Sequence, residues 1–270
     1  MIDVHSHVLP GIDDGTKEVE EALEFCRQAR ERGTEILVAT PHHKPGAYEN
    51  PRDRVLERME DLQRLLDARG IALKLAPGSE IFADTGLPEK LTSGALLTYG
   101  DARRYMLLEF SFQQYPINVD DMIFRLRLAS ITPVIAHPER IRYFQEDRDR
   151  LENMIRMGAL AQITSSSLTG TFGSRVREIS EEMIRRRCIH FLASDAHDLS
   201  YRPPDLSRAY RRLTELVGED EARRMVRDNP EAVLEGREIR APEPVPDEDV
   251  NKGGGIRGIL GRFGLGRRSR

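Results

Sequence analysis

Histidine and carboxylate side chains occur in short polar clusters along this 270-residue sequence. Six of its seven histidines lie in these clusters, whereas His190 lies at the start of an apolar run and is interpreted as structural. Nine side chains are candidate metal ligands: His5, His7, Asp14, His42, Glu80, Glu109, His137, Asp195 and His197. Nine nitrogen and oxygen ligands without a thiolate exceed the needs of one divalent ion, so they predict two or three ions. Mixed imidazole and carboxylate ligands suit Mn²⁺, Fe²⁺ or Zn²⁺.

Such a cluster makes hydroxide from water near neutral pH and holds phosphoryl oxygens between ions about 3.5–4 Å apart. Hydrolysis of phosphate esters is therefore the predicted reaction class. Single members have plainer explanations, because Glu80 could stabilise a helix N-terminus and Glu109 could form an ordinary ion pair. The joint pattern is what indicates metal, since so many unpaired imidazoles and carboxylates in one place would be energetically costly.

Two arginines follow these clusters in predicted loops. Arg140 lies three residues beyond His137, and Arg202 lies five residues beyond His197. A guanidinium group binds phosphate oxygens in pairs and stabilises the charge of a transferring phosphoryl group. Arg140 and Arg202 are therefore candidate catalytic and substrate-binding residues, with an ordinary surface arginine as the alternative for each. His43 has no distinct ligand role and is a further candidate for substrate binding, with a structural role as the alternative.

Seven short apolar runs must position these side chains, because a polar cluster follows each run. The runs span residues 2–4, 35–39, 72–76, 105–108, 133–136, 160–163 and 189–193. Such uninterrupted Val, Ile, Leu and Ala residues are typical of parallel strands buried on both faces. Helical periodicity occurs over residues 19–29, 55–66, 119–129, 148–157, 174–187, 206–217 and 220–227. The alternation predicts an α/β fold with a parallel sheet, closed or nearly closed into a barrel, whose strand C-termini share one mouth.

Composition excludes several classes of protein. Hydrophobic residues make up 39% and charged residues 32%, which provides one core beneath a highly charged surface. The apolar runs are too short for a membrane-spanning helix, and the N-terminal residues do not resemble a signal peptide. Two cysteines, Cys26 and Cys188, cannot form a disulfide framework or a cysteine zinc site. These features favour the cytoplasm.

Charge is unevenly distributed along the chain. The net charge is −4, with bases but no acids in the last nineteen residues and acids but no bases in residues 241–251. The preceding residues are mildly acidic, and only 6% of residues are aromatic, which argues against a nucleic-acid binder. We predict one domain over residues 1–240 and a disordered, acidic-then-basic tail over residues 241–270. The basic part could instead contact an anionic membrane surface weakly as a short amphipathic helix, although its glycines oppose helix formation.

The polar clusters also form longer motifs, namely HSHVLPGIDDG, ATPHH, PGSEI, LLEF, AHPER and SDAH. With them the sequence resembles the polymerase-and-histidinol-phosphatase (PHP) superfamily. More narrowly, it resembles the bacterial manganese-dependent protein tyrosine phosphatases of the capsule and exopolysaccharide type. LPGIDDG, TPHH and AHPER together are specific to this narrower group, whereas HxH and DxH alone indicate only the superfamily. The similarity extends to about residue 239, so the family pattern does not explain the basic tail.

The resemblance implies a distorted (β/α)7 barrel, similar to a TIM barrel, with a three-metal centre at the C-terminal ends of the strands. Mn²⁺ is the metal it implies first, with Fe²⁺ or Zn²⁺ as alternatives. The implied ligand sets are His5, His7 and Asp195 with Glu80 as a bridge; Glu80, Glu109 and His137; and Asp14, His42 and His197. Arg140 and Arg202 match the phosphate-binding arginines of the family.

The activity that the resemblance implies is removal of phosphate from tyrosine residues of a membrane-associated bacterial kinase that controls polysaccharide export. One alternative is a small-molecule phosphatase of the histidinol-phosphate type, which would use the same cluster. Another is a non-catalytic module that binds the phosphotyrosines of the kinase without hydrolysing them. The complete set of candidate ligands argues against this second alternative. If the basic tail contacts lipid, the enzyme would lie at the membrane periphery; the sequence predicts no oligomeric state.

Overall fold

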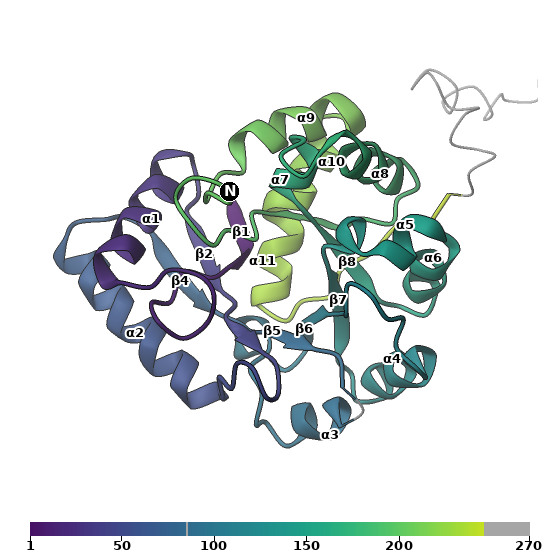
Figure 1. The fold of residues 1–270 in the computed structure, drawn as a ribbon, viewed down its shortest axis with the longest axis horizontal. Coiled ribbons are helices and arrows are strands. Elements are labelled where there is room, and N and C mark those ends of the chain that lie inside the picture. The colour runs from purple at the N-terminus through teal and green to yellow at the C-terminus, as the bar shows by residue number, and fades with distance from the viewer. Residues whose placement is uncertain (85, 246–270) are drawn as a thin grey trace, which may run out of the picture.

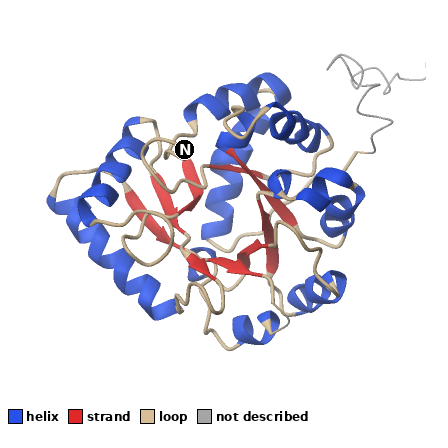
Figure 2. Cartoon of the chain, in the orientation of Figure 1, coloured by secondary structure: helices blue, strands red, loops and turns tan. Residues whose placement is uncertain are grey.

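Parallel strands joined by helices make up the fold, and the computed structural model describes residues 1–84 and 86–245 of it. Figures 1 and 2 show the strands arranged in a ring, with most of the helices outside it. The strands are β1 (Ile2–Ser6), β2 (Ile36–Ala39), β3 (His42–His43), β4 (Lys74–Pro77), β5 (Glu80–Phe82), β6 (Tyr105–Glu109), β7 (Thr132–Ala136), β8 (Leu160–Thr164) and β9 (Phe191–Ala193). Each of the seven predicted runs corresponds to one of these strands, and β3 and β5 are additional. The predicted α/β fold with parallel strands is confirmed.

The strands belong to two sheets, with the orders β1-β2-β4 and β3-β5-β6-β7-β8-β9. The chain passes from the first sheet to the second twice, because β3 follows β2 and β5 follows β4 after two residues each. On the other side, the segments at the ends of β1 and β9 adjoin. There His7 donates its N–H to the carbonyl oxygen of Ala196, and Asp195 donates to that of His5, both at 2.9 Å.

The seven predicted periodic segments all correspond to helices, four further helices occur among the described residues, and most of these helices lie on the outer side of the strands. They are α1 (Val19–Glu31), α2 (Arg52–Ala68), α3 (Leu87–Thr92), α4 (Val119–Leu128), α5 (Arg142–Glu146), α6 (Asp149–Arg156), α7 (Ser165–Leu168), α8 (Ser174–Arg185), α9 (Ser207–Val217), α10 (Glu219–Arg223) and α11 (Asn229–Leu234), with short helical turns η1 (Tyr99–Asp101), η2 (Pro138–Arg140) and η3 (Arg224–Asp228). In α1, residues such as Ala22, Cys26 and Ala29 are buried because they share one face. Among the described residues, no helix is both long and apolar enough to cross a membrane.

One apolar cluster contains side chains from every strand except β3 and β5 and fills the space between the strands. Its strand members are Ile2, Val4, Ile36, Val38, Ala76, Tyr105, Leu107, Val134, Ala136, Leu160, Phe191 and Ala193. Val233 of α11 packs in the same cluster, and Figure 1 shows α11 within the outline of the ring. Residues that alternate with these on β2 and β4, such as Leu37 and Leu75, pack with α1 and α2 instead. The cluster is therefore a rigid base for the strand ends.

An irregularity in β1 changes the direction of its last side chains. Ile2 and Asp3 pair with residues 34 positions later in β2, but Ser6 pairs with Ala39, so β1 contains one extra residue. A bulge of this kind turns the following side chains to the other face of a strand. Ile2 and Val4, at even positions, thus face the interior cluster before the bulge. After the bulge the odd-numbered His5 faces the interior.

Most of the predicted tail lies outside the described residues. Residues 241–245 have no regular secondary structure, and Val245 donates its N–H to the carbonyl oxygen of Arg186 at 2.9 Å. The predicted amphipathic segment with its membrane contact falls on residues that the structure does not describe. Disorder and membrane contact of the tail therefore stay predictions.

Candidate metal centre

The nine predicted ligands lie together at the C-terminal ends of the strands. Three groups have ligand atoms within 4.8 Å of one another: His7, Asp14, His42 and His197; His5, His7 and Glu80; and His42, Glu80 and Glu109. The two remaining candidates adjoin these groups. Asp195 Oδ1 lies 3.3 Å from His5 Nε2, and His137 Nε2 lies 2.9 Å from Glu80 Oε1. The loops and strands thus bring all nine side chains into one cluster.

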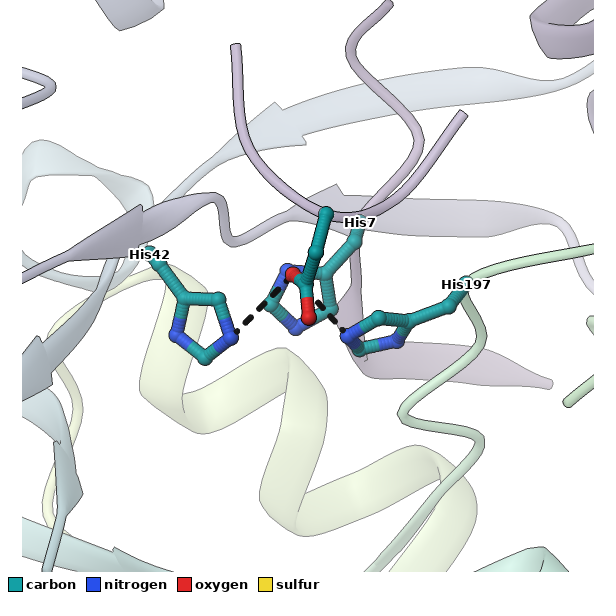
Figure 3. A group of neighbouring side chains, drawn as sticks. His7, His42 and His197 are labelled. Atoms are coloured by element: carbon teal, nitrogen blue, oxygen red, sulfur yellow. Dashed lines mark ion pairs between the residues drawn. The ribbon is translucent and has the colours of Figure 1, made fainter. Parts of the chain in front are cut away.

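The first group surrounds Asp14, the most exposed of the ligand candidates. Asp14 Oδ1 lies 3.4 Å from Nε2 of both His42 and His197. Figure 3 shows the rings of His7, His42 and His197 converging on the same small volume. His7 also belongs to the group with His5, so it lies between two of the possible ion positions. The family pattern placed His7 with His5, Asp195 and Glu80, and the geometry also brings it next to Asp14, His42 and His197.

Three of the imidazoles are oriented by a hydrogen bond at Nδ1. His5 Nδ1 lies 2.9 Å from Gln162 Oε1, and His7 Nδ1 lies 2.8 Å from Asp13 Oδ2. His197 Nδ1 lies 3.0 Å from the carbonyl oxygen of Asp195. When each Nδ1–H donates to its oxygen, the lone pair of Nε2 is left for a metal ion.

Asp13 and Gln162 are functional candidates that sequence reasoning missed. Asp13 is adjacent to the predicted ligand Asp14, and Gln162 is a polar residue inside a buried apolar strand, which is the signal that could have found it. Asp13 also accepts backbone N–H groups of Gly15 and His42, both at 3.0 Å, and so joins the first loop to β3. Gly15 is necessary there, because a Cβ on this residue would lie 2.0 Å from the carbonyl oxygen of His7.

Several polar atoms in the cluster are buried without a suitable partner. His42 Nδ1 and Glu80 Oε2 lie 3.0 Å apart, but among the described residues neither they nor Glu109 Oε2 form a hydrogen bond of acceptable geometry. Buried polar atoms are rarely left unpaired, because each one costs desolvation energy. A set of such atoms on imidazoles and carboxylates fits the ligand preferences of divalent transition metals.

Burial and neighbouring charges change the acidity of these groups. Burial opposes ionisation of Glu80 and Asp195, but the adjacent His5 holds the pKa of each carboxyl well below its usual range. Burial, followed by the negative charge of Glu80, raises the pKa of Glu109 to about 7. Burial is also the main reason why the pKa of His197 falls to about 4. Burial opposes protonation of His5, His7 and His42 as well, but the adjacent carboxylates raise the pKa of each of these imidazoles. The carboxylates of the cluster thus attract positive charge, either as protons on these imidazoles or as metal ions.

The two predicted arginines meet at one carboxylate oxygen of the cluster. Nη1 of Arg140 and Nη2 of Arg202 each lie 2.6 Å from Asp195 Oδ2. Their side chains are 20% and 18% exposed, whereas that of Asp195 is 1% exposed. The arginines thus form the accessible edge of a buried site, where an anion can reach both guanidinium groups.

His43 lies beside the cluster but contacts a different partner. Its Nδ1 lies 3.2 Å from the carbonyl oxygen of Asn50, and among the described residues it forms no ion pair with the candidate ligands. The Asn50 side-chain amide donates to the carbonyl oxygens of Ile12 and His42, at 3.0 and 2.8 Å. These contacts support the loop that carries the ligands, and substrate binding by His43 stays a prediction.

Comparison with known proteins identifies the family. The model of the family described as "Capsular polysaccharide synthesis, CpsB/CapC" matches residues 1–235. The chain belongs to the CpsB/CapC family. The chain is similar to tyrosine-protein phosphatase YwqE of Bacillus subtilis, with 36% identity over 247 residues, which cover 91% of this chain and 96% of YwqE. Tyrosine-protein phosphatase CpsB of Streptococcus pneumoniae is 30% identical over 239 residues, 87% of this chain and 98% of CpsB.

Solved structures agree with this assignment to the CpsB/CapC family. One of the crystal structures of YwqE and CpsB, which are described as unique metal-dependent tyrosine phosphatases, superposes with a TM-score of 0.86 at 35% identity. The match covers 91% of this chain and 100% of the solved chain. The phosphotriesterase homology protein of Escherichia coli has a TM-score of 0.56 at 12% identity, covers 86% of this chain and 97% of its own, and shares the fold alone. The family that the sequence motifs predicted is confirmed.

Proposed function

We propose that this chain is a metal-dependent protein tyrosine phosphatase. The observation that carries the proposal is the convergence of nine nitrogen and oxygen ligands with two arginines at one edge of the strands. The names of the CpsB/CapC relatives support the reaction, since they are tyrosine-protein phosphatases. We also propose that the two sheets act as one distorted barrel, with β3 and β5 continuing β2 and β4 and with β1 beside β9.

The three groups of side chains would hold two or three divalent ions, for which we propose Mn²⁺, with Fe²⁺ or Zn²⁺ as the alternatives. Their ligands are His5, His7, Glu80 and Asp195 for one ion; Glu80, Glu109 and His137 for a second; and Asp14, His42 and His197, with His7 close by, for a third. Bound ions of this kind lower the pKa of water and offset the negative charge of a phosphoryl group.

Arg140 and Arg202 are the groups of this chain that bind the phosphate. Each guanidinium now forms an ion pair with Asp195 through one nitrogen, and its other N–H groups are available to phosphoryl oxygens. Their fixed positive charge stabilises the charge that accumulates on these oxygens in the transition state. Tyrosinate is a moderate leaving group with a pKa of about 10, so it departs without a strong general acid.

For the physiological substrate we propose a phosphotyrosine-containing bacterial kinase that controls capsular or exopolysaccharide synthesis, in the cytoplasm. The support is the family description, which is capsular polysaccharide synthesis. A small-molecule phosphatase of the histidinol-phosphate type is the alternative that the same cluster would permit.

The test is hydrolysis of a phosphotyrosine peptide with Mn²⁺ and with EDTA, for the wild type and for Arg140→Ala. We expect EDTA to abolish turnover and Arg140→Ala to lower kcat/KM by about 10²- to 10³-fold, the usual cost of removing one group that stabilises transition-state charge. Arg142→Ala is the matched control, because this arginine is 79% exposed and pairs only with Glu146 among the described residues. Full turnover after exhaustive chelation would overturn the proposal, and a preference for histidinol phosphate over the peptide would favour the alternative.

A further inference from the structure

Two aromatic side chains contact Arg140 on the accessible side of the site, and a third packs against one of them. The guanidinium carbon of Arg140 lies 4.7 Å from the ring centre of Phe172 and 5.3 Å from that of Phe112. The ring of Tyr201 lies edge-to-face against that of Phe172, with centres 6.1 Å apart. Phe112 also stacks on His137, with ring centres 5.4 Å apart and planes 11° apart. We call Phe112, Phe172 and Tyr201 the aromatic collar.

The aromatic collar is assembled from three separate loops and is not part of the apolar core. Phe112 follows β6, Phe172 lies between α7 and α8, and Tyr201 lies between β9 and α9. Phe112 is 38% exposed and Tyr201 is 59% exposed, whereas Phe172 is half-buried. Exposed aromatic surface gathered around a charged group is typical of a ligand-binding site, because it gains free energy when a ligand covers it.

The loop of Tyr201 also carries Arg202, so one turn positions a collar ring and a phosphate-binding group together. The Asp198 carboxylate accepts the backbone N–H groups of Ser200, Tyr201 and Arg202, at 2.7, 2.6 and 3.2 Å. These bonds fix the backbone between the strand end and Arg202. The positions of the Tyr201 ring and the Arg202 guanidinium group relative to each other are thus fixed at this side of the site.

We propose that the aromatic collar binds the phenyl ring of phosphotyrosine and thereby selects aryl phosphates over phosphoserine and phosphothreonine. This inference rests on the proposed function, because it takes the phosphate to be bound by Arg140 and Arg202. A single oxygen atom joins the phenyl ring to phosphorus, so the ring lies next to the guanidinium groups that hold the phosphate. Phe112 and Phe172 occupy that neighbourhood in this structure.

Phosphoserine would leave most of this surface uncovered. Its ester oxygen is followed by one methylene group and the peptide backbone, which present no flat apolar face to the collar. The planar guanidinium of Arg140 can lie against aromatic rings while its edge donates hydrogen bonds to phosphate. The same arginine therefore binds the phosphate and contributes one face of the space for the phenyl ring.

The experiment compares two ligands that share a phosphonate group, benzylphosphonate with a phenyl ring and methylphosphonate without one. Their dissociation constants are measured by calorimetry on the Mn²⁺-loaded wild type and on Phe112→Leu, Phe172→Leu and Tyr201→Leu. We expect each substitution to weaken benzylphosphonate by about 2- to 12-fold, the range for one aromatic pair, and to leave methylphosphonate within twofold. The matched control is Phe124→Leu on α4, since Phe124 is 57% exposed and lies outside the collar.

Equal weakening of both ligands would overturn the proposal, because it would mean that the rings only position Arg140. An unchanged affinity for benzylphosphonate in all three variants would overturn it as well. The binding measurement does not depend on turnover. If the wild type fails to hydrolyse phosphotyrosine peptide, the proposed function is refuted, but the ratio of the two phosphonate affinities still tests the collar. If the peptide is hydrolysed, we expect its kcat/KM to fall by the same factor as the affinity for benzylphosphonate.

Discussion

Replacing Asp13 by asparagine tests whether the orientation of His7 matters for metal binding. Asp13 is 6% exposed, and its carboxylate accepts three hydrogen bonds. Oδ2 accepts from His7 Nδ1 at 2.8 Å and from the N–H of His42 at 3.0 Å, and Oδ1 accepts from the N–H of Gly15 at 3.0 Å. An asparagine has one accepting oxygen and one donating NH₂ group, so it cannot make all three bonds.

Both orientations of the asparagine side chain have a cost. If its oxygen faces His7, its NH₂ group faces the N–H of Gly15, and that buried donor is left unpaired. If its NH₂ group faces His7 instead, Nδ1 must accept the hydrogen bond and the proton must move to Nε2. The lone pair that would bind a metal ion is then lost. Losing a partner of this kind reduces metal affinity by about 10- to 100-fold, and an unpaired buried donor costs about 1–3 kcal/mol of unfolding free energy.

The assay is a calorimetric titration of the metal-free protein with Mn²⁺, together with a measurement of Tm. We expect Asp13→Asn to raise the Mn²⁺ dissociation constant by about 10- to 100-fold and turnover to recover when Mn²⁺ is supplied in excess. Asp53→Asn is the control, because the Asp53 side chain is 93% exposed on α2. A folded Asp13→Asn protein with the Mn²⁺ affinity of the wild type would refute this account of His7.

Three further predictions concern the metal, the pH dependence of stability and the thiols. Removal of the ions with EDTA should lower Tm by about 5–11 °C. A ligand at 100 times its dissociation constant contributes about 2.7 kcal/mol to the unfolding free energy, and 1 kcal/mol corresponds to about 2–4 °C in a domain of this size. Calorimetry that finds equal Tm values with and without the ions would contradict this. Burial lowers the pKa of His190 to about 4 from 6.5, so the unfolded state binds the extra proton first as pH falls. In the metal-free protein the contribution of His190 to the unfolding free energy should therefore drop by about 3 kcal/mol from pH 7 to pH 4. Denaturant titrations of His190→Gln should lack this component of the pH slope, and an identical slope in the variant would show that other groups cause it. Burial also raises the pKa values of the Cys26 and Cys188 thiols, that of Cys188 to about 12. A thiol reagent at pH 7.5 should therefore leave the activity of the folded enzyme unchanged. Inactivation in proportion to labelling would contradict this prediction.

Much of the fold could be predicted, because strands that are buried on both faces leave continuous apolar runs in the sequence. The runs that became β1, β2, β4 and β6–β9 are of this type, and the polar residues after each run showed where the strands end. Strands β3 and β5 could not be found in this way. They consist of two or three residues, among them His42 and Glu80, whose types are determined by the site and not by a core.

The parts of the site that the sequence did not predict depend on single positions. The extra residue in β1 appears only in the pairing with β2, since the alternation of side chains in the sequence gives no sign of a bulge. The roles of Asp13 and Gln162 follow from the imidazoles beside them in space and not from their neighbours in the sequence. The aromatic collar comes from three loops without periodicity, so only the folded chain shows that Phe112 and Phe172 meet at Arg140 and that Tyr201 packs against Phe172.

The contact between the segments at the ends of β1 and β9 has a consequence for the synthesis of this protein. Asp3 accepts the backbone N–H of Ser194, 191 residues later in the chain, and the proposed ligands His5 and Asp195 meet at the same place. At about 5–20 residues per second, the ribosome completes the last of these segments about 10–40 seconds after the first. A partly synthesised chain therefore cannot hold the full set of ions. The full set of ions can bind only after translation has passed β9, so a nascent chain that ends before this strand would have no phosphatase activity.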